Sequence, residues 1–161
     1  MKKRIMSFVS SLMVFCMIMG VSIVNVKASD EKMVDGSYLT TDETSTGYSS
    51  SKTRGIYLMD GECSISKAGR NRVYAYASTT ANMKVNYMCT IVYVDQYQED
   101  LDEWWQIDWW MEEVDNDYYM STAKTITVDR GYYYRVRANH LVGNSYPFEE
   151  TASFTNGILV P

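Results

Sequence analysis

The residues best suited to chemistry lie between 103 and 111, where all four tryptophans of the chain are found. If this run is a strand, its side chains alternate between two faces. One face would carry Trp105, Ile107, Trp109 and Met111, which we expect in the core. The other would carry Trp104, Gln106, Asp108 and Trp110. Indole rings beside an amide and a carboxylate suit a polar ligand, so Trp104, Asp108 and Trp110 are predicted to bind a glycan or a protein. Burial of these rings under loops or under the preceding segment is the alternative.

A second group of candidate residues comes from the alternating segment 132–139. Alternation turns Tyr132, Tyr134, Val136 and Ala138 inward and Tyr133, Arg135, Arg137 and Asn139 outward. Tyrosine and arginine are frequent in recognition surfaces, so Tyr133 and Arg135 are added to the predicted ligand-binding residues. A ladder of cross-strand pairs with acidic neighbours is the alternative.

Catalytic and metal-binding patterns are missing from the sequence. The only histidine, His140, has no serine or cysteine motif beside it, and we expect a hydrogen-bonded structural role for it. Asp108 and Glu112 would need a cleft to act as paired carboxylates. The acidic segments lack the spacing of an EF-hand, and no Cys-x-x-Cys pair occurs. We therefore expect no cofactor, no metal and no enzymatic activity.

The N-terminus has the organisation of a secretory signal peptide. A basic start, Met1-Lys2-Lys3-Arg4, precedes an apolar stretch over 5–26, and Val26-Lys27-Ala28 resembles a cleavage site. We predict a signal peptide over 1–28, cleavage after Ala28 and a secreted, extracellular protein. An uncleaved membrane anchor is the alternative, because about 20 apolar residues can span a bilayer.

Cleavage would change both the charge and the cysteine count. The chain has 15 basic and 20 acidic residues, and loss of four basic residues with the leader leaves 11 against 20, a net charge of −9. Such a chain is a poor partner for nucleic acid or for anionic membranes. Cys63 and Cys89 would be the two remaining cysteines, and we predict a disulfide between them in an oxidising compartment. Two independent buried thiols are the alternative.

The chain after the leader is predicted to be all-β. Residues 29–53 form a Ser/Thr-rich lead-in that we expect to be solvated, with Tyr38 or Tyr48 able to hold part of it as an edge strand. Over 54–161, short alternating runs predict one antiparallel β-sandwich of about seven to nine strands. Runs at 72–78, 84–96 and 121–128 are predicted as separate strands. Acidic turns are expected at 99–103 and 112–117.

Two resemblances bear on this fold. The segment 126–139 with Gly143-Asn144-Ser145 resembles the second half of a fibronectin type III module, which would make Tyr132 the corner tyrosine whose hydroxyl returns to upstream backbone. The order of motifs from Gly36-Ser37-Tyr38-Leu39 through Gly131-Tyr132-Tyr133 to Thr155-Asn156-Gly157-Ile158 is similar to a family of small exported proteins of Gram-positive bacteria, a domain of unknown function. This resemblance implies export and a single domain, and it assigns no functional residue.

The function predicted from the sequence is that of a secreted, non-enzymatic module that binds a glycan or a protein. A structural or assembly role at the cell surface is the first alternative, and a small extracellular hydrolase is the second. The sequence leaves the oligomeric state open.

Overall fold

The computed structural model describes residues 31–49 and 55–161, and the described residues form nine strands and no helix. The strands are β1 (Met33–Val34), β2 (Ser37–Thr40), β3 (Thr44–Tyr48), β4 (Leu58–Lys67), β5 (Arg72–Gln98), β6 (Glu103–Thr127), β7 (Tyr132–Gly143), β8 (Glu149–Phe154) and β9 (Gly157–Val160). This confirms the all-β prediction. The predicted signal peptide, with its cleavage after Ala28, lies outside the described residues.

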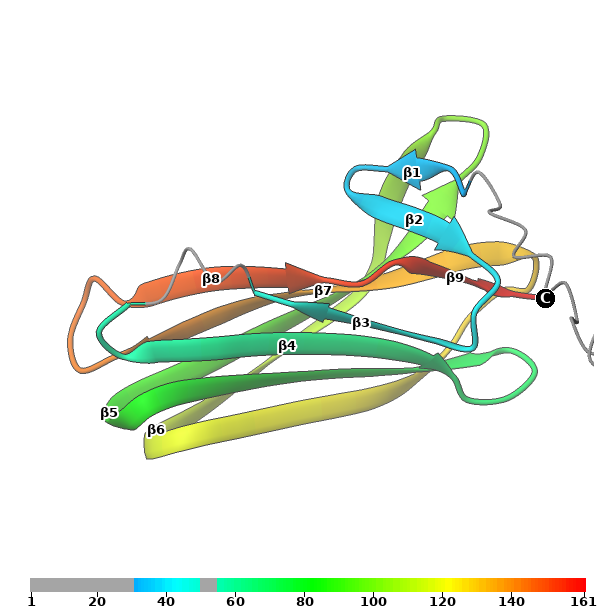
Figure 1. Ribbon diagram of the computed structural model, residues 1–161. Coiled ribbons are helices and arrows are strands. Elements are labelled where there is room, and N and C mark those ends of the chain that lie inside the picture. Colours follow the sequence, from blue (N-terminus) through cyan, green and yellow to red (C-terminus); the bar gives the residue numbers. More distant parts are fainter. Residues whose placement is uncertain (1–30, 50–54) are drawn as a thin grey trace, which may run out of the picture. The chain divides into compact units, whose positions relative to one another are not determined.

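The long hairpin of β5 and β6 organises the other strands (Figure 1). The two strands pair antiparallel over nearly their whole length, with a shift of register between Thr80 and Val85. The first part of β5 pairs with β4, whereas its second part pairs with β7. The Trp110 indole in one part of β6 donates a hydrogen bond of 2.9 Å to the Thr122 hydroxyl in the other part. The hairpin therefore bends, and one curled sheet forms two facing layers.

The segment 112–117 is strand and not the turn that the sequence predicts. Glu112, Glu113 and Asp115 are exposed on β6, Asp117 is half-buried, and only Val114 of this segment packs against a buried cluster. An edge strand with one solvated face needs few apolar residues, so its composition resembles that of a turn. Asn116 adopts a left-handed φ of 55°, which distorts the strand locally without reversing its direction.

The sheet is mixed, which corrects the prediction of an antiparallel sandwich. Its order is β1-β2-β9-β7-β5-β4-β3, with β6 on β5 and β8 on β7. All pairs are antiparallel except β2 with β9, which are parallel. The parallel pair arises because part of the predicted lead-in enters the sheet beside the last strand. Ser37 and Thr40 are buried there, and the Ser37 hydroxyl donates to the Thr155 carbonyl at 2.8 Å.

Two buried clusters form the core between the layers. The larger cluster joins β4, β5, β7 and β9 with the end of β6. It contains Cys63, Ile65, Val73, Ala75, Ala77, Val92, Val94, Ile126, Val128, Tyr134, Val136, Ala138, Ile158 and Val160. The smaller cluster, nearer the bend, contains Leu58, Ala81, Val85, Met88, Met120 and Val142. The period-two alternation of β5 and β7 predicts most of these positions, because an apolar residue at every second place faces the opposite layer.

The strands β3 and β8 approach each other closely on the side away from β6. A Cβ atom at Gly47 of β3 would overlap the carbonyl oxygen of Phe154 in β8. The Ser45 hydroxyl also accepts a hydrogen bond of 2.9 Å from the Asn156 amide. Gly47 is therefore required by the space between two backbones.

We expect Gly47→Ala to lower the free energy of unfolding by about 2 kcal/mol or more, because the added methyl group must push β3 away from β8. Thr46→Ala is the matched control, since Thr46 is exposed on the same strand, and it should change stability by less than about 0.5 kcal/mol. Urea denaturation followed by tryptophan fluorescence measures both. Equal stability of the two variants would contradict the close approach.

Candidate functional site

A buried ionic group lies at the centre of the region that contains the predicted ligand-binding residues. Asp95 on β5 is 1% exposed, and its Oδ2 accepts from Arg135 Nε at 3.0 Å and from Arg137 Nε at 2.6 Å. Arg137 Nη2 also donates to Asp95 Oδ1 at 3.1 Å. The hydrogen bond to Asp95 raises the pKa of Arg137. Three charges thus share one network, and the single carboxylate aligns two neighbouring arginines of β7.

The turn between β1 and β2 covers this network. Arg135 Nη2 pairs with the Asp35 carboxylate at 2.9 Å, and Nη1 donates to the Asp35 carbonyl and the Ser37 hydroxyl, each at 3.1 Å. The Arg135 guanidinium lies 4.5 Å from the ring centroid of Trp104, whose indole donates to the Val34 carbonyl at 3.0 Å. Arg135 and Trp104 therefore hold the N-terminal hairpin against the sheet. Arg135 lies on the outer face of β7, as predicted, but it is buried there beneath the N-terminal hairpin.

A β-bulge divides the tryptophan run, so the predicted alternation fails. Val94 pairs with Asp108 while Asp95 pairs with Gln106, which leaves Ile107 as an extra residue in β6. Before the bulge, Trp104 packs with Tyr97 and Arg135. After it, Trp110 packs against the larger core cluster. Trp104 and Trp110 consequently lie on opposite faces of the sheet.

The exposure of the four tryptophans corrects the prediction further. Trp105 and Trp109, which the sequence assigns to the core, are 51% and 56% exposed. Trp104 and Trp110, which it assigns to an outer platform, are half-buried. The sequence could not reveal this because β6 is an edge strand that pairs with β5 alone among the described strands. Rings on either face of an edge strand can be exposed to solvent.

Asp108 and Trp110 form a separate group on the inner side of β6. Asp108 pairs with Lys124 at 2.7 Å, and the Lys124 ammonium lies 5.6 Å from the ring centroid of Trp110. With the Thr122 bond to Trp110, these contacts join the two parts of the bent strand. The structure therefore separates the five predicted ligand-binding residues, with Trp104, Tyr133 and Arg135 near the N-terminal hairpin and Asp108 and Trp110 at the bend.

An aromatic row crosses the outer face of four strands. It consists of Trp109 on β6, Tyr93 on β5, Arg137 on β7 and Phe154 on β8, which are successive cross-strand partners. The Arg137 guanidinium lies 4.9 Å from the Tyr93 ring centroid, and Asp95 holds it in place. Trp109 and Phe154, at the two ends, are 56% and 49% exposed. The row is a regular surface of large rings that faces solvent.

Apolar and acidic side chains extend this outer face beyond the aromatic row. The next cross-strand set contains Met111, Ile91 and Asn139, and the one after it contains Glu113, Cys89 and Leu141. Met111 is exposed, while Ile91, Asn139 and Leu141 are half-buried. The outer face is therefore apolar near Trp109 and becomes acidic toward Glu113.

Cys63 and Cys89 are free thiols in the structure, which corrects the predicted disulfide. Cys63 belongs to the larger core cluster, and burial raises the pKa of its thiol to about 12. Cys89 alternates with Met88, which faces the smaller core cluster, so Cys89 belongs to the outer face of β5. Burial also raises the pKa of Cys89. The two thiols lie on opposite sides of the sheet and cannot pair without rearrangement.

Tyr134, and not Tyr132, makes the corner hydrogen bond. Its hydroxyl donates to the Asp129 carbonyl at 2.8 Å and accepts from Gln96 Nε2 at 2.9 Å. The Tyr134 side chain is fully buried, as are Val136 and Ala138, which agrees with the predicted inward face of β7. Tyr132 is exposed at the start of the strand, before the opposite layer covers it.

His140 lies in a buried chain of hydroxyl groups between the layers. Its Nδ1 is 2.8 Å from the Thr79 hydroxyl, and its Nε2 is 2.8 Å from the Ser153 hydroxyl. Thr79 also bonds Thr90 at 2.6 Å. Burial lowers the pKa of His140 to about 4, so the ring is neutral near pH 7. A Cβ atom at Gly61 would overlap the ring, so this glycine makes room for it. The ring is hydrogen-bonded and packed, as the sequence predicts.

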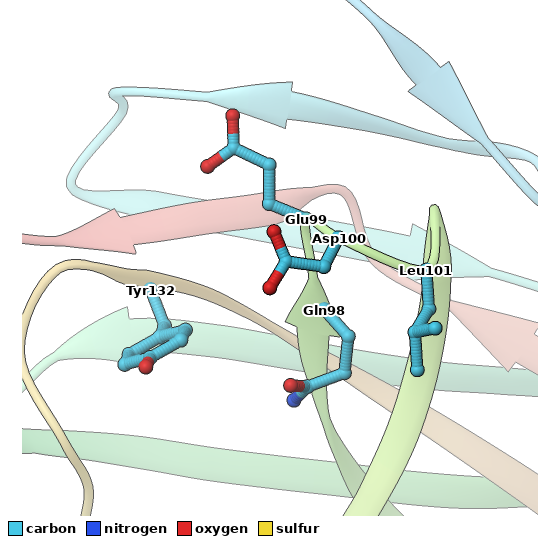
Figure 2. A pocket seen from close by; sticks show the side chains of 5 residues that line it. All are labelled: Gln98, Glu99, Asp100, Leu101 and Tyr132. Carbon is cyan, nitrogen blue, oxygen red and sulfur yellow. The ribbon is translucent and has the colours of Figure 1, made fainter.

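A cavity of about 440 Å³ lies between the β5–β6 turn and the start of β7 (Figure 2). Gln98, Glu99, Asp100, Leu101 and Tyr132 line it. Its carboxylates are exposed, and the Gln98 amide bonds its neighbour Gln96 at 3.0 Å. Among the residues that the structure describes, no three His, Cys, Asp or Glu side chains gather as metal ligands. The cavity thus lacks a buried polar group directed into it.

The sequence analysis missed Asp95 and the N-terminal partners of Arg135. A signal for Asp95 exists, because it is the only carboxylate in the predicted strand 84–96, whose other residues are mostly apolar. Such a residue needs a buried cationic partner, and the alternating arginines of β7 are candidates. Asp35 and Ser37 carry no comparable signal, since a Ser/Thr-rich segment also fits a solvated linker.

These features define a small all-β protein with a buried ionic network and an aromatic outer face. A family model described as a family of unknown function (DUF6147) matches residues 27–158. The match spans most of the chain, and the chain belongs to this family. No curated protein matches the chain. Within 31–49 and 55–161, the structure contains no helix able to cross a membrane.

Replacing Asp95 should destabilise the fold strongly. We expect Asp95→Asn to lower the free energy of unfolding by about 3 kcal/mol, because it leaves two arginines beside an uncharged amide. Asp42→Asn is the control, since Asp42 is exposed and forms no ion pair with any residue that the structure describes. Thermal unfolding measures both variants, and equal midpoints would contradict the network.

His140 should make the folded state sensitive to mild acid. Its pKa is about 4 in the folded chain and near 6.5 when unfolded, so protonation favours unfolding. Stability is therefore greatest above pH 6.5 and should fall by up to about 1.4 kcal/mol per pH unit below it. Urea denaturation from pH 7 to pH 5 measures the slope, which His140→Gln should reduce. If that variant fails to fold, the wild-type imidazole signal still tests the prediction by NMR, because titration above pH 6 would contradict it.

Proposed function

We propose that this protein is an extracellular, non-enzymatic module that binds a glycan or a protein through the outer face of β6, β5, β7 and β8. The observation that carries the proposal is the aromatic row, which has an exposed indole at one end and an exposed phenyl ring at the other. Exposed large apolar side chains that gather on one regular surface are typical of interaction sites. The signal-peptide pattern of residues 1–28 supports the extracellular location.

The rigidity of the aromatic row favours binding. Tyr93 and Arg137 are stacked, and Arg137 is held by two hydrogen bonds to the buried Asp95. A ligand that contacts the row would order few additional side chains, so less conformational entropy opposes binding. Flat aromatic surfaces of this kind suit both sugar rings and the apolar parts of protein partners. The proposal keeps the predicted function but moves the contact residues from Trp104 and Trp110 to Trp109 and Phe154.

A structural role in assembly is the second candidate. The same row would then pack against another chain, and Phe154 would be covered together with Trp109. Light scattering separates the two candidates, because assembly predicts a stable oligomer in which the Trp109 indole is shielded from a soluble quencher. A small hydrolase is a third candidate, and an activity screen on wall polysaccharides and peptides tests it.

Removal of the Trp109 ring should abolish most ligand binding. A ligand is first identified in two ways. Cell-wall polysaccharides and host glycans are titrated against the protein and followed by tryptophan fluorescence. Extracellular proteins are captured in a pull-down and identified by mass spectrometry. We then expect Trp109→Ala to weaken its affinity at least tenfold, because a large ring in a contact surface contributes about 1–3 kcal/mol.

The matched control is Trp105→Ala. Trp105 has nearly the same exposure as Trp109 but lies before the bulge and outside the aromatic row. This variant should retain the wild-type affinity within about twofold. Unchanged binding by Trp109→Ala, or an equal loss in both variants, would refute the proposal.

A further inference from the structure

The strand β6 has an unpaired edge. It pairs with β5 alone among the strands that the structure describes, so its other edge carries backbone groups without a ladder partner. Two side-chain carboxylates accept hydrogen bonds from backbone amides of β6, one before residue 110 and one after residue 117. Asp108 accepts from the Trp109 amide at 2.8 Å, and Asp117 accepts from the Tyr118 amide at 2.7 Å. The part between them, residues 110–117, spans about 26 Å.

This edge is strongly acidic. The segment 103–117 contains six carboxylates and no lysine or arginine. Asp108 pairs with Lys124, and Glu113 accepts a hydrogen bond from the Tyr87 hydroxyl. Glu112 and Asp115 are exposed and form no ion pair with any residue in 31–49 or 55–161. The charges of Glu112 and Asp115 therefore lie along the free edge without an ionic partner among the described residues.

The charge argues against a second copy of this chain as the occupant. Antiparallel pairing of β6 with itself about residues 110–117 would bring the carboxylates of one copy close to those of the other. Like charges across strands destabilise a pair, and acidic edges protect sheets from self-association. A basic partner would instead gain from the same charges, both in affinity and in the rate of encounter.

We propose that the edge of β6 over residues 110–117 binds an extended lysine- or arginine-rich segment of another protein by strand addition. This inference rests on the proposed function and names its ligand class. The alternating outer side chains of β6 are Trp109, Met111, Glu113 and Asp115, as their partners on β5 show. An added strand would place apolar side chains beside Trp109 and Met111 and basic ones beside Glu113 and Asp115. Main-chain hydrogen bonds supply affinity in this mode, and alternate side chains supply specificity.

The test uses defined peptides and the whole mature protein. The probe is a fluorescein-labelled peptide with blocked ends in which two lysines and two valines alternate with threonines, made in both chain directions. A second version carries N-methyl groups on the backbone amides that would face β6. Fluorescence anisotropy at low ionic strength measures the affinity. We expect one direction to bind and its N-methylated version to bind at least tenfold more weakly, because methylation removes the donors needed for strand addition.

Charge variants locate the contact. The double variant E113Q/D115N, which neutralises the two carboxylates on the outer face of β6, should weaken peptide binding at least fivefold. The double variant E99Q/D100N removes the same charge at the β5–β6 turn, away from the edge, and should change binding by less than about twofold. Circular dichroism and thermal unfolding confirm that both variants are folded.

Several outcomes would overturn the inference. If the N-methylated peptide bound as tightly as the unmethylated one, or if both double variants lost the same affinity, net charge alone would explain the attraction between peptide and protein. Failure of both peptide directions to bind would also overturn it, as would a dimer in light scattering that hides the β6 edge. If a glycan binds in a Trp109-dependent manner while neither peptide binds, the proposed function stands and this inference fails. If the peptide binds and W109A changes neither peptide nor glycan binding, the edge is correct and the aromatic row is not the contact surface.

Discussion

The strands β5 and β6 belong to both layers of the curled sheet, and this shared use constrains the remaining structure. Because β5 pairs with β4 in one part and with β7 in the other, the bend near Thr80 fixes how far apart the layers lie. The gap is filled by valine, alanine and isoleucine side chains and by one buried tyrosine. The contacts of Trp110 with Thr122 and Lys124 brace the same bend from β6. Both the core and the outer face depend on this geometry.

Among the residues that the structure describes, every buried side-chain nitrogen or oxygen atom has a hydrogen-bond partner. Thr79, Thr90, His140 and Ser153 satisfy one another between the layers. Asp95 and the two arginines do the same on the outer side, where Ser37 and Asp35 complete the set. Buried polar networks of this kind tie particular strands together, because a shift of one strand would leave several donors and acceptors unpaired. The N-terminal hairpin is held in this way, together with the buried side chain of Val34.

Much of the fold follows from local sequence patterns, whereas the site does not. Alternation in 72–78, 84–96 and 132–139 predicts all-β structure and the inward positions of β7, because a two-layer sheet selects an apolar residue at every second place. It cannot reveal that 72–98 is one bent strand, since the irregular residues at the bend resemble a turn. The burial of Ser37 and Thr40 likewise cannot be predicted from the local sequence. Ser37 bonds to Thr155, which is 118 residues away, and Thr40 pairs with Ile158 of the parallel strand β9. The tryptophans are assigned to the wrong faces because the sequence does not show the bulge at Ile107. The disulfide is predicted because the sequence does not show that Cys63 and Cys89 lie on opposite sides of the sheet.

The extra residue in β6 shows how one position of chain length can govern a surface. If the same residues paired with β5 without this bulge, every side chain on one side of Ile107 would turn to the opposite face relative to the other side. The ring that now meets solvent after the bulge would exchange places with the ring that now meets the core. The chemistry that β6 presents to solvent therefore depends on the bulge as well as on the aromatic and acidic residues of the strand.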